Sequence, residues 1–327
     1  MSEQIKTIGV FTSGGDAPGM NAAIRSVVRK AKFEGLMVKG IMRGYEGLIN
    51  NEMIEMDSRS VGGILSCGGT ILKTARSKEF MTKEGREKAA KNIKENNIDG
   101  LIIIGGNGSF MGASIFEKEW GVKTVGVPGT IDNDLGGTDY TIGAHTSVDT
   151  VLDAVDKIRD TVSSMERIYV IEVMGRKEPY IAVMAGLSGG AEEILYPGCK
   201  FDIKKLVEEI KQGEKKGKKS WIIIVSEGFS SGPEIAEKIS NESGHEVRSV
   251  VLGHVQRGGS PNAPDRILAS MMGAYAVEVL SSGKSGCMVA INGKNLSTVP
   301  YEEACFERDK DFEFNEKLYV LTKMLAS

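Results

Sequence analysis

Apolar runs of strand length that end in glycine-rich turns recur along the first half of this 327-residue chain, and helical spacing follows the turns. Lys6–Thr12 and Leu101–Ile104 are two such runs, and a further strand is predicted over Met37–Ile41. Helices are predicted over Met20–Phe33 and Phe110–Glu119, after the glycines. Repeated strand–turn–helix units predict an α/β fold with an open, doubly wound sheet. Its ligand crevice should lie beyond the strand ends.

The pattern starts again after Ala144. The elements expected in this second half are a helix over Thr146–Thr161, strands over Arg167–Arg176, Trp221–Val225 and Arg248–Leu252, a helix over Ala263–Leu280, and a final strand and helix. Single cores usually divide beyond ~250–300 residues, so we expect two interleaved Rossmann-like, three-layer α/β/α domains with mostly parallel sheets. The larger is predicted to take residues 1–143 and 256–305, and the smaller 144–255 and 306–327.

Composition narrows the possible functions. A net charge of -3 gives no reason to expect nucleic acid as a partner. Four cysteines that lie far apart, without a C-x-x-C pair or a signal peptide, predict reduced thiols in a cytoplasmic protein. Only three histidines disfavour a zinc site, and no apolar run is long enough to predict a membrane span. Neither a Walker A loop nor a complete G-x-G-x-x-G motif after the first strand is present in the sequence.

The stretch from Pro128 to Asp139 carries two carboxylates, Asp132 and Asp134, on a loop constrained by proline and glycines. Beside a hydroxyl and a polyphosphate, one carboxylate could accept a proton while the other orients a hydrated Mg²⁺. The alternative is an Asx-rich turn whose side chains satisfy their own backbone. Three glycine turns at successive strand ends favour a ligand site, although a tight turn by itself needs no ligand.

Basic residues mark the strand ends of the second half: Arg167, Arg176, Arg248 and Arg257. Each one alone is also compatible with an ordinary surface charge. His254 and Arg257 share one glycine-bounded loop, and a phosphate group suits the geometry of a guanidinium. The lysines between Lys211 and Lys219 are either a solvated helix end or part of an anionic effector site.

Four segments in this order resemble the bacterial ATP-dependent 6-phosphofructokinase family, and the match runs essentially end to end. The segments are Gly14–Arg25, Pro128–Asp134, Met174–Arg176 and Leu252–Pro261. The resemblance implies the phosphofructokinase fold, with ATP bound by the larger domain and fructose 6-phosphate by the smaller. It implies transfer of the γ-phosphoryl group of MgATP to the 1-hydroxyl of the sugar phosphate, a step of glycolysis. It also implies a homotetramer controlled by an anionic effector such as ADP or phosphoenolpyruvate.

The resemblance assigns roles to individual residues. Asp132 is the implied general base, Thr130 and Asp134 support substrate and metal, and Arg176 stabilises the transferred phosphoryl group. The implied nucleotide cradle consists of Gly15, Arg76, Ser77, Gly106, Asn107, Gly108 and Ser109. The implied sugar-phosphate pocket consists of Thr130, Asp132, Met174, Gly175, Arg176, Glu227, His254 and Arg257, with Arg167 and Arg248 reaching it from a neighbouring subunit. The implied effector site consists of Arg25, Arg29, Arg159, Gly190, Glu192, Lys216 and Lys218, and the implied metal ligands are Asn107 and Asp134.

Four positions or segments depart from the family pattern: Gly63, Asn107, Ala144–His145 and Lys177–Tyr180. Asn107 replaces an aspartate that helps to hold Mg²⁺, which keeps an oxygen but removes a charge. Lys177–Tyr180 replaces a His-x-Gly-Asp segment, in the loop that aims Arg176. We therefore keep a second hypothesis beside an active enzyme: a catalytically weak or inactive paralogue that binds sugar phosphate or nucleotide and regulates an active subunit. If the missing charge limits turnover, Asn107→Asp should raise kcat.

Overall fold

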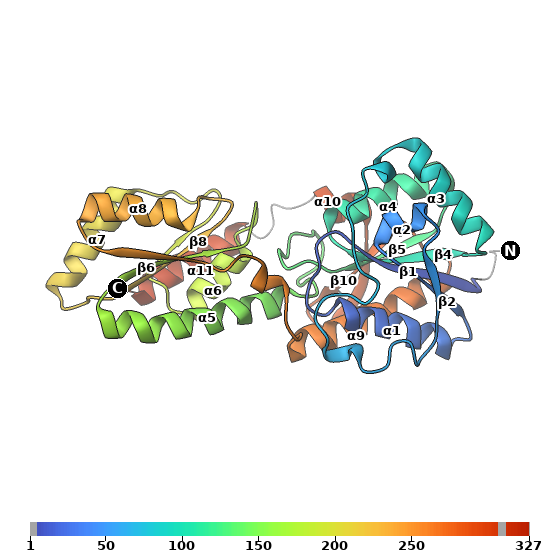
Figure 1. Ribbon diagram of the computed structural model, residues 1–327, viewed down its shortest axis with the longest axis horizontal. Coiled ribbons are helices and arrows are strands. Elements are labelled where there is room, and N and C mark those ends of the chain that lie inside the picture. The colour runs from blue at the N-terminus through green and yellow to red at the C-terminus, as the bar shows by residue number, and fades with distance from the viewer. Residues whose placement is uncertain (1–4, 307–311, 327) are drawn as a thin grey trace. The chain divides into compact units, whose positions relative to one another are not determined.

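The computed structural model describes residues 5–306 and 312–326, which fall into two compact units (Figure 1). The first unit comprises the described residues up to Thr146 and from Arg257 to Phe306. The second comprises Ser147–Gln256 and the C-terminal helix. In each unit, helices cover both faces of one sheet, so the predicted fold class is confirmed.

The sheet of the first unit has seven strands. In spatial order they are β11 (Asn295–Pro300), β10 (Cys287–Asn292), β5 (Thr124–Pro128), β4 (Gly100–Gly105), β1 (Thr7–Ser13), β2 (Met37–Ile41) and β3 (Met53–Met56). Each edge strand is antiparallel to its neighbour, β11 to β10 and β3 to β2. The five strands between them run parallel to one another. Every residue of β4 is buried, because helices cover both faces of the central strands.

Helices α1 (Met20–Phe33) and α9 (Ala263–Ser281) cover one face of this sheet (Figure 1). The other face carries α2 (Gly44–Ile49), α3 (Lys83–Glu95), α4 (Asn107–Trp120) and α10 (Tyr301–Phe306). The bounds predicted for α1 and β2 are confirmed. The helical pattern of α1 was plain because its buried residues include Ala23, Val27 and Ala31, at intervals of four.

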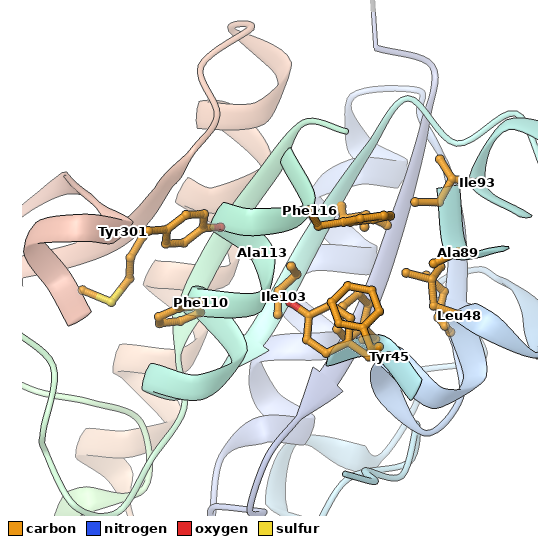
Figure 2. Close-up of a cluster of buried hydrophobic side chains, with 14 of the residues drawn as sticks. Tyr45, Leu48, Ala89, Ile93, Ile103, Phe110, Ala113, Phe116 and Tyr301 are labelled. Carbon is orange, nitrogen blue, oxygen red and sulfur yellow. The ribbon is translucent and has the colours of Figure 1, made fainter. Parts of the chain in front are cut away.

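An aromatic cluster fills the layer between the sheet and α2, α3 and α4 (Figure 2). Tyr45 of α2 stacks on Phe80 with 3.9 Å between ring centroids, and Phe80 meets Phe116 of α4 edge-on at 5.3 Å. Phe110 of α4 stacks on Tyr301 at 5.4 Å. Aromatic pairs at such spacings are favourable beyond their buried area. The cluster therefore anchors α4, whose first turn lies at the carboxyl end of β4.

The sheet of the second unit is entirely parallel. In spatial order its strands are β7 (Glu193–Leu195), β8 (Trp221–Ser226), β6 (Ile168–Val173) and β9 (Val247–Val251). One face carries α5 (Ala144–Met165), α6 (Tyr180–Ser188) and α11 (Phe312–Ala326), and the other carries α7 (Ile203–Lys215) and α8 (Gly232–Ser243). Apolar side chains of α7 and α8 pack on β6 and β8 to form the core of this unit.

Several predicted element bounds are wrong: the strand expected over Arg167–Arg176 ends at Val173, and the helix expected over Thr146–Thr161 extends from Ala144 to Met165. Two further differences have identifiable reasons. Helix α4 begins at Asn107, three residues before the predicted start, because the glycines of the turn also form its first turn. The final predicted strand is a hairpin of β10 and β11, in which Asn292 pairs with Asn295 across Gly293 and Lys294. Gly293 has φ of 62°, which suits a two-residue hairpin turn.

Candidate active site

The carboxyl ends of β1, β4 and β5 lie side by side in the first sheet. They lead into the turn that holds Gly15, the turn at Gly106 and the loop at Thr130. The backbone N–H of Gly129 donates to the carbonyl oxygen of Gly105 at 2.9 Å. A Cβ added to Gly106 would lie 3.5 Å from the Cβ of Thr130. The structure thus brings three predicted site segments together at one edge of the sheet, where open α/β sheets bind ligands.

Neighbouring residues of the loop after β5 have different roles. The backbone N–H of Asp132 donates to Oγ1 of Thr130 at 3.2 Å. Asn133 adopts φ of 47°, and its Oδ1 accepts the backbone N–H of Thr141 at 2.8 Å. The Asn133 side chain therefore ties the loop to its far end through Asp139 and Thr141, while Asp132 and Asp134 on either side are half-buried carboxylates. The loop thus carries the carboxylates of Asp132 and Asp134, and the side-chain amide of Asn133 holds its backbone in place.

Arg257 lies over the turn that follows β1. Its Nη1 donates to the carbonyl oxygen of Asp16 at 3.1 Å. A Cβ on Gly15 would lie 2.6 Å from the same nitrogen, so a side chain at position 15 would displace the guanidinium. The resemblance assigned Gly15 to the nucleotide and Arg257 to the sugar phosphate, yet both lie at the carboxyl end of β1. A guanidinium beside glycine N–H groups is well suited to hold phosphate oxygens.

The segment that carries Arg76 and Ser77 is tied to the same turn. Oγ1 of Thr74 donates to the carbonyl oxygen of Gly14 at 2.7 Å. The side chain of Arg76 is exposed, whereas Oγ of Ser77 accepts the backbone N–H of Phe80 at 3.2 Å. Ser77 therefore has a local structural role in addition to the predicted one, and Arg76 is the group of this segment that can reach solvent.

Asn107 is the first residue of α4 and has a specific partner. Its Nδ2 donates to the carbonyl oxygen of Cys305, at the end of α10, at 3.2 Å. The thiol of Cys305 in turn donates to the carbonyl oxygen of Asn107 at 3.6 Å. An aspartate could not donate this hydrogen bond. The asparagine therefore joins α4 to α10, a role that the sequence comparison with the family pattern did not reveal.

Asn107→Asp is expected to have two opposed effects. It should lower the free energy of unfolding by about 1–3 kcal/mol, because the carbonyl of Cys305 loses its donor and faces a carboxylate. It should also raise kcat at limiting Mg²⁺, because a carboxylate is a better magnesium ligand than an amide. Thermal unfolding and the Mg²⁺ dependence of turnover measure the two effects separately.

Asn107→Ala is the matched control, because it removes the same donor without adding a charge. It should have a lower melting temperature than the wild type, like the aspartate variant. The Mg²⁺ concentration that it needs for half-maximal turnover should be no lower than that of the wild type. Equal melting temperatures of all three proteins would count against the structural role of Asn107. An equal Mg²⁺ requirement would count against its place near the metal.

Tyr45 was not singled out from the sequence, although it supports the predicted nucleotide cradle. Its hydroxyl donates to the carbonyl oxygen of Ser109, in the first turn of α4, at 2.6 Å. Burial raises the pKa of the Tyr45 phenol well above its usual range, so the hydroxyl keeps its proton. Ser109 is itself buried and packs against Gly105 and Gly14. The predicted ligand Ser109 thus contributes the shape of the cradle, whereas the neighbouring Gly108 is exposed.

In the second unit, five predicted residues follow strands that are neighbours in the sheet. Met174, Gly175 and Arg176 follow β6, Glu227 follows β8, and His254 lies in the 3₁₀ turn η3 (Gly253–Arg257) after β9. Because β6 pairs in parallel with both β8 and β9, these residues gather at one end of the sheet. This end is again the carboxyl edge, where ligands of such sheets bind.

The loop that carries Arg176 is held by contacts that the sequence did not reveal. The hydroxyl of Ser226 donates to the carbonyl oxygen of Gly175. A Cβ on Gly228 would lie only 1.9 Å from the carbonyl oxygen of Arg176, which no packing arrangement permits. Position 228 must therefore be glycine for the Arg176 loop to lie where it does. Only the tertiary contact shows this requirement.

Two further features shape the same loop. Oε1 of the fully buried Gln256 accepts the backbone N–H of Met174 at 3.1 Å. Pro179 caps α6 and Tyr180 is its first residue, so half of the divergent Lys177–Tyr180 segment belongs to a helix start. A proline is well tolerated there because helix starts leave backbone N–H groups unpaired.

Arg167 and Arg248 lie at the opposite edge of the second sheet. Arg167 precedes β6, and Arg248 is the second residue of β9, opposite Tyr169. Both arginines form ion pairs with Glu246, at 3.2 Å for Arg167. Within one chain the structure does not bring them to Arg176. The implied contribution from a neighbouring subunit stays a prediction.

Three predicted effector residues, Glu192, Lys216 and Lys218, line one pocket of about 480 Å³ in the second unit. Lys218 lies 3.3 Å from a carboxylate oxygen of Glu192 and 4.7 Å from the ring centroid of Trp221. Arg159 lies elsewhere in this unit and donates to the carbonyl oxygen of Gly190 at 2.7 Å, while Arg25 and Arg29 lie on α1 of the first unit.

Lys323 of α11 lines the same pocket and was missed from the sequence. Its Nζ donates to Glu193 at 2.9 Å and to Glu209 at 2.7 Å. Burial alone would lower the pKa of Lys323, but these two carboxylates outweigh it and raise the pKa. The pocket therefore contains a permanently charged lysine from the C-terminal helix. No local pattern indicates a contact of such long sequence separation.

No cluster of three histidine, cysteine, aspartate or glutamate side chains in the described residues has the arrangement of a protein-only metal site. None of the helices within residues 5–306 and 312–326 has both the length and the apolar character that crossing a bilayer demands. The predicted metal residues instead lie at the carboxyl edge of the first sheet, Asp134 on the β5 loop and Asn107 at the start of α4.

The phosphofructokinase family profile matches residues 7–280. The chain belongs to the phosphofructokinase family. It is 51% identical over 323 residues to the ATP-dependent 6-phosphofructokinase of Thermoanaerobacter sp. (strain X514), with 98% of this chain and all of the relative covered. It is 53% identical over 320 residues to the enzyme of the same name from Clostridium botulinum (strain Hall), with the same shares covered.

Solved phosphofructokinase structures agree with the fold. The phosphofructokinase of Saccharomyces cerevisiae superposes with a TM-score of 0.88 at 34% identity, over 98% of this chain and 48% of that one. The Pichia pastoris enzyme gives 0.87 at 35% identity, over 100% of this chain and 41% of that one. This chain thus spans a little under half of each yeast phosphofructokinase. A pyrophosphate-dependent phosphofructokinase from Nitrosospira multiformis, 21% identical, shares the fold.

Proposed function

We propose that this phosphofructokinase transfers the γ-phosphoryl group of ATP to the 1-hydroxyl of fructose 6-phosphate, yielding fructose 1,6-bisphosphate and ADP. Relatives named as ATP-dependent 6-phosphofructokinases share more than half of its residues across nearly the whole chain. The structural observation that carries the proposal is the β5 loop, in which Asp132 and Thr130 lie beside the β4 turn and the start of α4.

Asp132 acts as the general base in this proposal. The sugar hydroxyl oxygen attacks the γ-phosphorus, its proton passes to the Asp132 carboxylate, and the bond to the bridging oxygen of ADP breaks. Phosphoryl transfer demands positioning and charge stabilisation more than covalent chemistry. The guanidinium of Arg176 supplies charge stabilisation to the transferred group. The glycine turns at Gly15 and Gly106 let the backbone approach the phosphates.

The residues present fit a magnesium ion. Mg²⁺ usually takes one or two protein carboxylates together with substrate phosphates, so a cluster of three acids is not required. The half-buried carboxylate of Asp134 at the carboxyl edge of the sheet meets that need. Asp134 would hold the ion, with Asn107 nearby, and the bound ion would neutralise charge on the phosphates of ATP.

The proposal extends to the parts that the family resemblance implies. The first unit binds ATP, and the second binds the sugar phosphate through Arg176, Glu227 and His254. The pocket at Glu192 and Lys218 takes an anionic effector such as ADP or phosphoenolpyruvate, in a homotetramer. Three lysines against two glutamates line this pocket, and the net positive charge supports an anionic ligand. Nothing in the comparisons favours the inactive paralogue. The presence of Asp132, Asp134 and Arg176 in this chain supports catalysis instead.

A coupled assay on the purified full chain tests the proposal. ADP formation should depend on fructose 6-phosphate and on Mg²⁺ or Mn²⁺, and pyrophosphate should not replace ATP. Absence of turnover in a protein that still binds both ATP and fructose 6-phosphate, measured by calorimetry, would support the regulatory paralogue instead.

A further inference from the structure

Asp265, in the first turn of α9, is fully buried. Its Oδ1 accepts the backbone N–H of Gly143 at 2.9 Å. Its Oδ2 accepts the backbone N–H of Thr146 at 2.7 Å and the hydroxyl of Thr146 at 2.5 Å. Nδ1 of His145 lies 3.7 Å from Oδ1. A carboxyl group is costly to bury without such donors, so its position here reflects a specific structural requirement.

The partners of Asp265 belong to the starts of two helices. Thr146 lies in the first turn of α5, where backbone N–H groups have no partner within the helix. Asn262 caps α9 by accepting the backbone N–H of Asp265 at 2.9 Å. The backbone N–H of Asn262 in turn donates to the hydroxyl of Thr146 at 3.0 Å. One carboxylate thus joins two helix N-termini, where negative charge is favourable.

Both helices follow directly on loops with proposed catalytic or substrate-binding roles. The hydroxyl of Thr141 donates to the carbonyl oxygen of Thr130 at 2.7 Å, so the chain from Thr130 to Gly143 is one fastened loop. Gly143 is the point where Asp265 holds the end of this loop. On the other side, Arg257 lies five residues before Asn262. Asp265 therefore fastens the exits of the Asp132 loop and of the Arg257 loop to each other.

We propose that Asp265 is a positioning residue for phosphoryl transfer, acting through the loops that carry Asp132 and Arg257. The inference rests on the function proposed above for those two residues. The carboxylate touches no reacting group itself. Releasing it frees the end of the Asp132 loop and the start of α5 together, and displacements of about 1 Å at a reacting group can cost ~100-fold in rate.

Asp265→Asn and Thr146→Val test the proposal, with Thr146→Ser as the conservative rescue. Asparagine would turn one N–H group toward a donor, and valine removes the hydroxyl that bridges Asp265 and Asn262. We expect kcat to fall by about 10–100-fold for Asp265→Asn and less for Thr146→Val. Thr146→Ser should restore kcat. KM for ATP should change little, because no hydrogen bond of Asp265 reaches α4 among the described residues, and KM for fructose 6-phosphate should rise with the shift of Arg257.

Leu280→Ala is the matched control for instability alone. Leu280 is fully buried at the opposite end of α9, where it packs beside Gly100. This variant should melt early and keep the kinetic constants of the wild type. The proposal is supported if Asp265→Asn or Thr146→Val lowers kcat at temperatures where Leu280→Ala does not. If Asp265→Asn does not fold, the comparison of Thr146→Val with Thr146→Ser tests the proposal.

An active wild type whose Asp265 and Thr146 variants differ from it only in melting temperature would overturn this inference alone. A wild type without turnover would overturn the proposed function, and this inference with it. Equal loss of kcat in Thr146→Val and Thr146→Ser would show that the hydroxyl bridge to Asp265 is not what positions the loop.

Discussion

Asp132→Asn is expected to lower kcat by roughly 10²–10⁴-fold, the range that a positioned general base contributes. The substitution keeps the shape of the side chain and the backbone N–H that donates to Thr130. It removes only the capacity to accept the proton of the sugar hydroxyl. Steady-state kinetics with fructose 6-phosphate and ATP should therefore show a loss in kcat, with KM values close to those of the wild type.

Asp139→Asn is a matched control within the same loop. Asp139 is exposed, and its Oδ2 accepts the backbone N–H of Gly293 at 2.6 Å, a bond that asparagine can also accept. This variant should keep its activity. If Asp132→Asn remains folded and retains the kcat of the control, Asp132 is not the base. A lower melting temperature with unchanged kcat would assign Asp132 to the structure of the turn instead.

Gly228→Ala is expected to reduce kcat/KM by about 100-fold, because it must displace the loop that carries Arg176. The added Cβ would lie 1.9 Å from the carbonyl oxygen and 2.5 Å from the carbonyl carbon of Arg176. Both are backbone atoms, so rotation of a side chain cannot relieve the clash. The loop must move as a unit, and the guanidinium moves with it. Kinetics on the folded variant measure the effect.

A double-mutant cycle shows whether Gly228 acts through Arg176. In an Arg176→Ala background, Gly228→Ala should cause little further loss, since the group that it displaces is already absent. Gly112→Ala is the control for adding a methyl group, because its Cβ would meet only the Tyr45 ring at an ordinary 3.4 Å. Additive losses in the double mutant would contradict the mechanism and point to general distortion of the second unit.

Sequence periodicity predicted correctly the helices that bury one apolar stripe and the strands that are covered on both faces. Helix α1 and strand β2 have their predicted bounds because apolar spacing and flanking glycines agree. The start of α4 was misplaced because Gly106 caps it without a polar side chain, so the usual start signal is missing. The β10–β11 hairpin was missed although a glycine at the first position of a two-residue loop, here Gly293, is a recognised turn signal.

The site residues that the sequence missed all act through contacts between distant segments. Tyr45 reaches Ser109 across 64 positions, and Lys323 reaches Glu193 across 130. Gly228 matters only because another loop's backbone lies against it. Motifs reveal residues that meet a ligand, because the ligand constrains their type and spacing. Residues that hold those motifs in place depend on packing, which a single sequence does not display.

The two tryptophans of the chain are distributed one to each unit, Trp120 at the end of α4 and Trp221 at the start of β8. Trp221 lines the pocket of the second unit, under the ammonium group of Lys218. Replacing Trp120 by phenylalanine would leave a single tryptophan, whose emission, excited at wavelengths that tyrosine does not absorb, responds to the charge and polarity of that pocket. The protein thus contains its own optical reporter, by which anionic ligands can be titrated without turnover and without a label.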